Sequence, residues 1–187
     1  MWWAELLNTV LGTLSSGVAA STSSYESIAS TSPTSGSSIS FTGISSDFKH
    51  LQIRINMICT SSAALLTTFN SDTGSNYAMH GLFGTGSATA VNGAATQANI
   101  QSLGQYAGTI TTYPNVVIMD IHDYASTSKY KTVRSFGGFD KNAAGGEVDL
   151  VSGLWMNTAA ITSVTFALSG GSYSSGTTFA LYGIKGA

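Results

Sequence analysis

The sequence predicts an all-β protein, an antiparallel β-sandwich of jelly-roll-like form that follows a short N-terminal amphipathic helix. Three observations support this fold class. Charged residues number only 7 Lys and Arg plus 9 Asp and Glu, or 9% of the chain, against roughly 25% in an ordinary soluble domain. Ser and Thr are abundant instead, and these residues suit strands and turns better than helices. Apolar and polar residues alternate with period two from Tyr25 onward, and turn-forming stretches recur at fairly even spacing.

The first segment, residues 1–14, has its apolar residues at helical spacing and therefore predicts an amphipathic helix. A helix this short is marginal alone in water, so its apolar stripe needs a partner surface. Residues 15–24 are small and polar, and we interpret them as a linker that separates the helix from a β-sandwich domain over residues 25–187. We therefore expect the stripe to bind another protein or to bundle with copies of itself; the alternative is packing on its own domain. The predicted partner-binding residues are Trp2, Trp3, Leu6, Leu7, Val10 and Leu11.

Period-two alternation and short apolar runs predict the strands of the sandwich. Residues 116–121 read VVIMDI, a run apolar enough to be buried on both faces, and we expect a bend at Gly153. Residues 84–112 are less patterned and predict a long surface loop with a weak strand near residues 97–103, and we interpret the glycines of residues 81–86 as turn residues. The expected strands lie near residues 38–42, 51–57, 64–69, 116–121, 131–136, 148–156, 164–168 and 177–184.

The charge pattern argues against nucleic acid and membrane partners. The net charge is −2, and only Lys129, Lys131 and Arg134 lie close together, which we interpret as a solvated strand end. No apolar run reaches the ~18–20 residues that cross a bilayer, and the predicted helix carries no Lys or Arg for a membrane surface. We expect no signal peptide, since no basic residue precedes the first apolar stretch. The single cysteine, Cys59, excludes an intrachain disulfide, and we expect it in the core.

Catalytic residue types are sparse, so we expect neither an enzyme nor a cofactor or resident metal. The densest ionisable group is Asp120, His122 and Asp123, where Asp120 and His122 would share one strand face. A metal or acid–base site would use such a group, but we favour polar side chains that cap a turn.

A second candidate is the stretch NSDTGSN, where Asn70, Asp72 and Gly74 suggest either a calcium loop or an Asx-turn between two strands. The full calcium-loop pattern with a later Glu is absent, and the two alternatives remain open. Aromatic residues near loops, which include Tyr77, Tyr106 and Tyr113, suit either a glycan or protein contact or the end of a core.

Several stretches resemble a family of small β-rich virion structural proteins that is frequent among environmental and cyanobacterial tailed phages. The resemblance runs from about Tyr25 to Lys185 and does not include the first 24 residues. The stretches are YESIAS (25–30), FTGISSDFKHLQIR (41–54), TFNSDTGSNYAMHGLFG (68–84), DIHDYASTSKYKTVRS (120–135) and SGLWMNTAAITSVTFALSGGSYSSGTTFALYGIKG (152–186).

The resemblance implies a virion location and a structural role. We expect a tail fibre or tail-associated appendage subunit, attached by its N-terminal helix, that forms trimers, binds other virion proteins and contacts a host-surface glycan or receptor. The alternative is a capsid decoration protein that stabilises the head. A glycan-binding module is a further hypothesis. A depolymerase is disfavoured because glycosidases need paired carboxylates and the chain has few.

Overall fold

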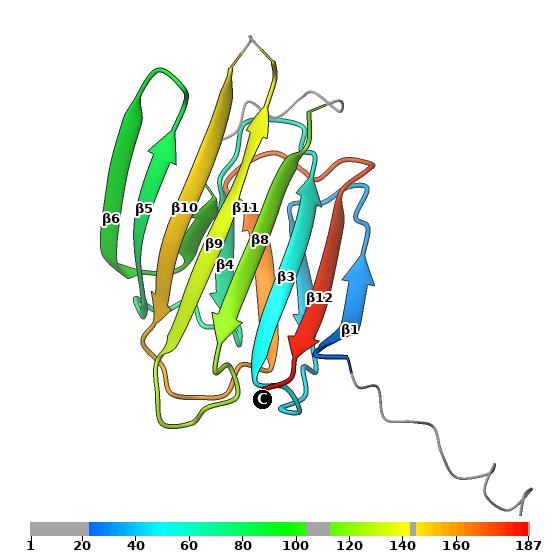
Figure 1. Ribbon diagram of the computed structural model, residues 1–187, viewed down its shortest axis with the longest axis vertical. Coiled ribbons are helices and arrows are strands. Elements are labelled where there is room, and N and C mark those ends of the chain that lie inside the picture. Colours follow the sequence, from blue (N-terminus) through cyan, green and yellow to red (C-terminus); the bar gives the residue numbers. More distant parts are fainter. Residues whose placement is uncertain (1–22, 104–112, 143–144, 187) are drawn as a thin grey trace, which may run out of the picture.

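The computed structural model describes residues 23–103, 113–142 and 145–186, which form two antiparallel sheets packed face to face (Figure 1). The predicted helix over residues 1–14 and residues 15–22 of the predicted linker lie outside the described residues. No helix in the described part of the chain is long and apolar enough to cross a membrane. The strands are β1 (Tyr25–Thr31), β2 (Ser38–Thr42), β3 (His50–Met57), β4 (Leu65–Phe69), β5 (Tyr77–Gly84), β6 (Thr89–Gln97), β7 (Ile100–Leu103), β8 (Asn115–His122), β9 (Lys131–Asp140), β10 (Gly146–Trp155), β11 (Ser163–Leu168) and β12 (Thr178–Ile184).

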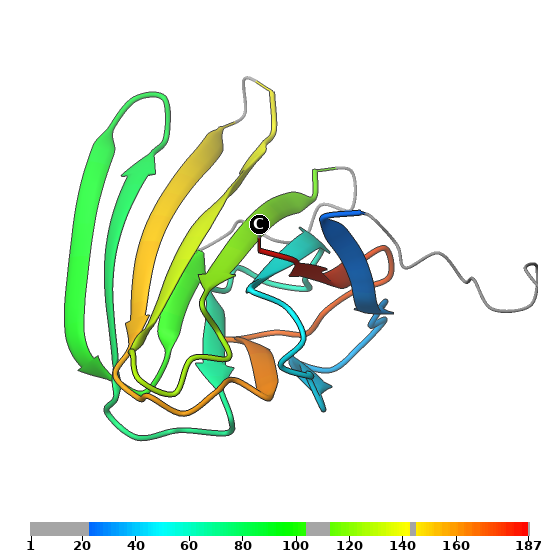
Figure 2. The same cartoon turned by 60° about the horizontal axis from the view of Figure 1, so that its bottom comes forward.

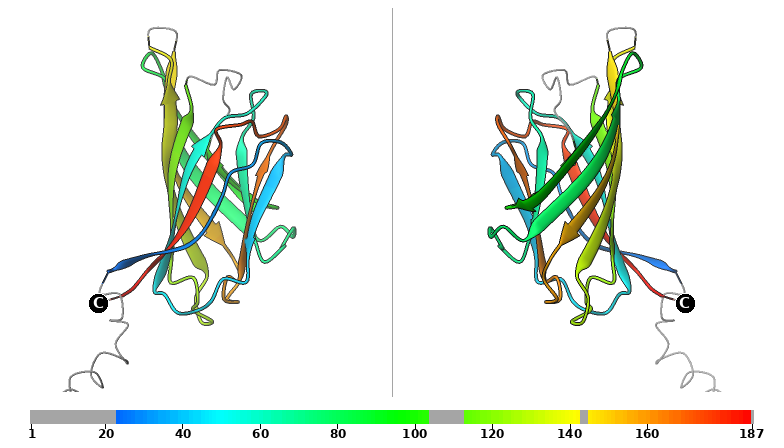
Figure 3. Two further views of the ribbon diagram at one scale, coloured as in Figure 1. Left: turned by 90° about the vertical axis from the view of Figure 1, so that its right-hand side faces the viewer. Right: turned by 90° about the vertical axis from the view of Figure 1, so that its left-hand side faces the viewer.

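The strand order is that of a jelly roll, which confirms the predicted fold class. The large sheet runs β1-β12-β3-β8-β9-β10-β5-β6 and the small sheet runs β2-β11-β4-β7. Four antiparallel pairings are nested: β1 with β12, β2 with β11, β3 with β8, and β4 with β7. The early part of the chain therefore pairs with the late part like one long hairpin rolled into two layers, which Figure 3 shows edge-on.

Two hairpins enlarge this roll on one side. The β9–β10 hairpin lies between β8 and β11 in the chain, and the β5–β6 hairpin lies between β4 and β7; both join the large sheet beyond β8. Figure 2 shows these strands as the broad wing of the large sheet. The inner side of β7 lies against β9, β10 and β5, whereas β6 is exposed along most of its length. The large sheet is thus twice as wide as the small sheet that covers its inner side.

Burial follows the alternation of side chains on each strand. On β8, Val117, Met119 and Ile121 point inward and are fully buried, whereas Val116 and Ile118 point outward and are 53% and 40% exposed. The expectation that residues 116–121 are buried on both faces is therefore wrong. The small sheet covers only the inner face of the large sheet, so no described part of the chain covers the outward set.

Other corrections concern glycine-containing strands. Residues 77–84 form β5, although Gly81 was expected in a turn, and residues 89–97 of the expected loop form β6. Both strands lack a clear period because β5 carries apolar residues on both faces and β6 consists mostly of small residues. The bend expected at Gly153 is also absent, since β10 pairs continuously on both sides. A Cβ at Gly153 would lie 2.7 Å from Ile100 Cδ1, so this glycine lets β7 approach β10 closely.

An aromatic cluster closes one end of the core. Trp155 is 1% exposed, and its ring centroid lies 5.6 Å from that of Phe69 and 6.4 Å from that of Tyr77. The Trp155 indole Nε1 donates a hydrogen bond of 2.8 Å to the Asp72 carboxylate, and the Tyr77 hydroxyl donates to the Asp72 backbone carbonyl at 3.0 Å. These contacts join the large sheet, through β10 and β5, to the turn that follows β4 of the small sheet.

We predict that Trp155→Ala lowers the free energy of unfolding by about 3–5 kcal/mol, because it removes a large buried ring and leaves a cavity between the sheets. Urea denaturation followed by circular dichroism measures this change. The control is Tyr130→Ala, since Tyr130 is 55% exposed; its effect should stay within about 0.5 kcal/mol. Equal losses for the two variants would contradict the assigned core.

Candidate interaction surface

The outer face of the large sheet carries a row of large apolar side chains that crosses five strands. Ile118 on β8 pairs with Phe136 on β9, which pairs with Leu150 on β10. Leu150 pairs in turn with Leu82 on β5, and Leu82 pairs with Val91 on β6. All five side chains point outward and are between 40% and 82% exposed. We call this line of residues the large row.

A second row, two residues along each strand, contains side chains no larger than valine. On β8, β9 and β10 it contains Val116, Gly138 and Val148, and on β5 and β6 it contains Gly84 and Thr89. We call it the small row. Gly138 has a φ of +149°, and a Cβ there would collide with the Glu147 backbone carbonyl, so this position keeps no side chain.

A shallow hollow of about 400 Å³ lies over Gly138. Val116 and Val148 stand on either side of it in the small row, and Phe136 of the large row stands at its edge. The outer face therefore presents a protruding aromatic ring next to an apolar depression.

The exposed apolar area is large for a protein without a partner. Seven large apolar side chains of the two rows are between 40% and 82% exposed: Leu82, Val91, Val116, Ile118, Phe136, Val148 and Leu150. Together they expose on the order of 700 Å², whereas the largest apolar patch of a typical monomer is roughly 300–600 Å². A patch of this size on one face is typical of a protein–protein contact surface.

Two charged side chains of β9, Arg134 and Asp140, stand on the same outer face, one on each side of the two rows. Arg134 lies two residues before Phe136, and its Nη1 donates hydrogen bonds to Ser152 Oγ at 2.6 Å and to the Val133 carbonyl at 3.1 Å. Asp140 lies two residues after Gly138, and its carboxylate accepts a hydrogen bond of 2.6 Å from the Asn142 backbone N–H. On β9 the two apolar rows therefore lie between Arg134 and Asp140, and Asp120 of β8 is the cross-strand neighbour of Arg134.

The Asp120, His122 and Asp123 group lies where β8 enters a turn, as the sequence indicates. Asp120 and His122 share the outer face, and the Asp120 carboxylate accepts a hydrogen bond of 2.9 Å from Gln52. Asp123 turns away at a φ of +48°, so it does not join the other two in one site. The arrangement supports the interpretation of polar side chains that cap a turn.

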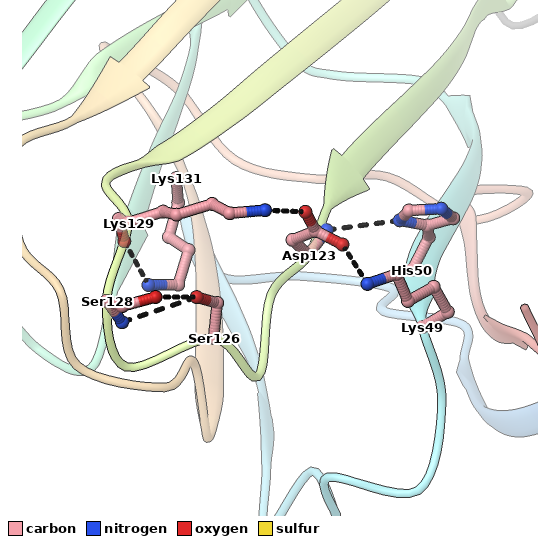
Figure 4. Close-up of polar contacts among 7 residues, drawn as sticks. All are labelled: Lys49, His50, Asp123, Ser126, Ser128, Lys129 and Lys131. Atoms are coloured by element: carbon pink, nitrogen blue, oxygen red, sulfur yellow. Dashed lines mark hydrogen bonds and ion pairs between the residues drawn. The ribbon is translucent and has the colours of Figure 1, made fainter.

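Asp123 anchors this turn through two lysines, as Figure 4 shows. Its carboxylate lies 2.7 Å from Lys49 Nζ and 2.8 Å from Lys129 Nζ. Hydrogen bonds from these two ammonium groups hold the pKa of Asp123 well below its usual range. The Asp123 backbone N–H donates to His50 Nδ1 at 3.1 Å, and burial, followed by the neighbouring His122, lowers the pKa of His50.

Lys131 corrects one expectation. It was assigned to a solvated strand end with Lys129 and Arg134, but its side chain is buried. Its Nζ donates hydrogen bonds to the backbone carbonyls of Lys129 at 2.8 Å and Thr158 at 3.1 Å (Figure 4 draws the first). Burial lowers the pKa of Lys131. This lysine ties two turns together, while Lys129 and Arg134 remain exposed.

The Asn70–Asn76 segment uses its side-chain oxygens for structural hydrogen bonds. Asn70 Oδ1 accepts from the backbone N–H groups of Thr162 at 2.8 Å and Ser163 at 3.1 Å. The Asp72 carboxylate accepts from the Trp155 indole, from Asn76 Nδ2 and from the Gly74 backbone N–H at 2.9 Å. These contacts support the Asx-turn interpretation of the loop. Within the described ranges, no group of three or more His, Cys, Asp and Glu side chains is placed to hold a metal ion.

The remaining sequence candidates are distributed between core and surface. Cys59 is buried, as expected, and burial raises the pKa of its thiol. Tyr77 is fully buried and belongs to the core, whereas Tyr113 is 39% exposed. Tyr106 lies outside the described residues, and so do the predicted partner-binding residues Trp2, Trp3, Leu6, Leu7, Val10 and Leu11.

A carboxyl pair on β10 went unnoticed in the sequence. Asp149 is fully buried and Glu147 is partly buried, and both side chains point to the inner side of the sheet. Burial first, then a hydrogen bond and charge repulsion from Asp149, raise the pKa of Glu147 to about 7. The spacing of two acidic residues at i and i+2 on one strand was the available signal.

No protein-family model matches the chain, and no curated protein and no solved structure matches it either. The outer face is therefore the candidate functional site on physical grounds. The residues that form it were not singled out in the sequence. The run VVIM at residues 116–119 was the available signal, because apolar residues on both faces of a strand indicate either double burial or an exposed apolar face.

We predict that Asp72→Asn destabilises the fold by about 1 kcal/mol at pH 7, since a charged acceptor of the buried indole is replaced by a neutral one. Hydrogen bonds, the one from Trp155 foremost, lower the pKa of Asp72. A carboxyl whose pKa is lower in the folded state contributes stability above its unfolded pKa of about 3.9, and this is lost as the pH falls further. Thermal melts of both proteins between pH 2 and 7 should converge at the acidic end; a constant difference would contradict the assignment.

We predict the opposite pH dependence for Glu147. Because its folded pKa of about 7 lies above the ordinary glutamate pKa of 4.5, its contribution to stability is complete below pH 4.5 and is lost as the pH rises through 7. Glu147→Gln should remove this dependence and make the melting temperature of the variant rise relative to the parent chain between pH 4.5 and 8. Glu26→Gln serves as the matched control, because Glu26 is exposed and paired with Lys185 at 3.0 Å. Parallel pH profiles for the Glu147 variant and the parent chain would overturn the pairing.

Proposed function

We propose that this chain is a structural subunit of a tailed-phage virion, a tail fibre or tail-associated appendage that works by assembly and not by catalysis. The observation that carries the proposal is the apolar outer face of the large sheet, which exposes seven large apolar side chains. A low charge content supports it, since a weakly charged surface opposes close packing of subunits very little. The resemblance of residues 25–185 to virion structural proteins supplies the biological setting.

In this proposal the jelly roll and residues 1–14 have different roles. The jelly roll forms a rigid body in which long-range strand pairing joins early and late segments of the chain. Residues 1–14 attach that body to other virion proteins through the predicted apolar stripe. Burial of each large apolar side chain of the stripe contributes about 1.5–3 kcal/mol before the cost of ordering the segment.

We predict that deletion of residues 1–14 abolishes incorporation into particles and leaves the jelly roll folded, because the described core lies entirely within residues 23–186. The measurement is quantitative mass spectrometry of purified virions, with separated tails and capsids, after growth of a phage that carries the deletion. Circular dichroism of the isolated variant reports the fold. A matched control replaces Asn8 and Thr9 of the polar side by Ala and should be incorporated at the parental level.

The same measurement separates the alternatives. Tens of copies in the tail fraction support the appendage role, whereas hundreds of copies in the capsid fraction support a decoration protein that stabilises the head. Full incorporation of the truncated chain would refute attachment through residues 1–14. Absence of the parent chain from both fractions would refute the virion role itself.

A further inference from the structure

We propose that the outer face of the large sheet packs against the same face of a second copy of this chain. The two copies are related by a two-fold axis that lies in the plane between the faces. The axis runs perpendicular to the strands and passes over β9 at the level of Gly137. The proposal rests on the assembly function above and names the partner of the apolar face. Its support is that the face is complementary to itself in shape, charge and size.

Shape complementarity follows from the two rows. An axis at the level of Gly137 places residues 136 and 138 of opposing β9 strands over each other, so the Phe136 ring meets the hollow above Gly138 of the other copy. The same operation sets Leu82 over Gly84, where β5 also lacks a side chain. Across the sheet the large row of one copy lies on the small row of the other, and each contact occurs twice, as in an isologous interface.

Charge complementarity follows from the same axis. Arg134 and Asp140 lie three residues on either side of Gly137, and both point to the outer face. The axis therefore brings Arg134 of each copy to Asp140 of the other copy, which produces two ion pairs at the margins of the interface. Asp120 on β8 is the cross-strand neighbour of Arg134, and its carboxylate accepts a hydrogen bond from Gln52 within the same copy. On β9 itself, a copy in parallel orientation would place Arg134 over Arg134 and Asp140 over Asp140, whereas the antiparallel orientation places opposite charges over each other.

The size of the face fits a second copy. The apolar rows expose on the order of 700 Å², close to the roughly 800 Å² that each partner contributes to a stable protein interface. The apolar centre and the charged margins reproduce the usual division into core and rim. Sheets that pack face to face keep their strands within about 30° of each other, so the register of Phe136 and Gly138, one step from the axis, survives the twist.

The decisive test is a charge exchange across the proposed interface, measured on the full chain by sedimentation. Arg134→Asp and Asp140→Arg should each raise the dissociation constant of the pair about tenfold or more, because each places like charges opposite one another twice per dimer. The double variant R134D/D140R should bind more tightly than either single variant. Residues 134 and 140 lie about 20 Å apart on one strand, so they restore no contact within one copy.

The outcomes are separable. Recovery in the double variant supports the face-to-face pair, together with association that salt weakens in the parent chain and strengthens in each single variant. A double variant as weak as the single variants, or weaker, overturns it. A parent chain that stays monomeric at concentrations on the order of 100 μM overturns it as well, since a specific subunit contact should form at such concentrations. Neither negative result touches incorporation into virions, which tests the proposed function separately.

A second variant tests the apolar centre and distinguishes the face from residues 1–14. Phe136→Glu should weaken the pair at least a hundredfold, because it places two charges in two apolar hollows. Tyr130→Glu is the matched control: Tyr130 has nearly the same exposure, 55% against 56%, but precedes β9 and lies outside both rows. Unchanged association of the Phe136 variant would mean that copies associate through another segment, such as residues 1–14, and would overturn the proposal. Unchanged thermal melts show that both variants are folded.

Discussion

Burial of one face of each sheet against the other is the interaction on which the rest of this structure depends. Side chains alternate across a strand, so once Val117, Met119 and Ile121 point into the core, Val116 and Ile118 must point out. The small sheet then fixes the inner layer, and its nested pairings tie strands that are far apart in the chain. The apolar character of the outward set has no role in this core. Because the core does not account for these exposed apolar side chains, we propose a contact function for the outer face.

The polar residues of the described chain serve mainly to hold turns and layers in place. Asp72 receives the Trp155 indole and orders the turn after β4, and Asp123 gathers two lysines at the end of β8. Lys131 is buried and spans two turns through backbone carbonyls. Each of these groups holds a turn in a defined position next to the sheets. These contacts fix the turns around the large sheet, and strand pairing sets the register of the two rows on its outer face.

Residue patterns predicted the fold where alternation was strong and where one face of a strand was polar. Residues 51–57 and 164–168 form β3 and β11 because their inward positions are apolar and most of their outward positions are polar. Prediction failed for β5 and β6, where apolar or small residues occupy both faces and glycines imitate turns. Gly153 was expected to bend β10 but instead makes room for Ile100 of the opposite sheet. For β5 and Gly153 the deciding neighbours, β10 and Ile100, lie far away in the chain, whereas β6 pairs only with the adjacent β5.

The sequence by itself determined the all-β class, the low charge, the scarcity of reactive groups and the position of most strands, because period-two burial is a local property of a strand. The amphipathic pattern of residues 1–14 also belongs to the sequence, and its role remains a prediction. Only the tertiary structure decided that Ile118, Phe136 and Leu150 stand side by side, that a hollow lies over Gly138 next to Ile118 and Phe136, and that Arg134 and Asp140 lie on either side along β9. The physical reason is that strand neighbours are chosen by non-local pairing. An outward apolar residue becomes part of a surface only when the strands beside it are known.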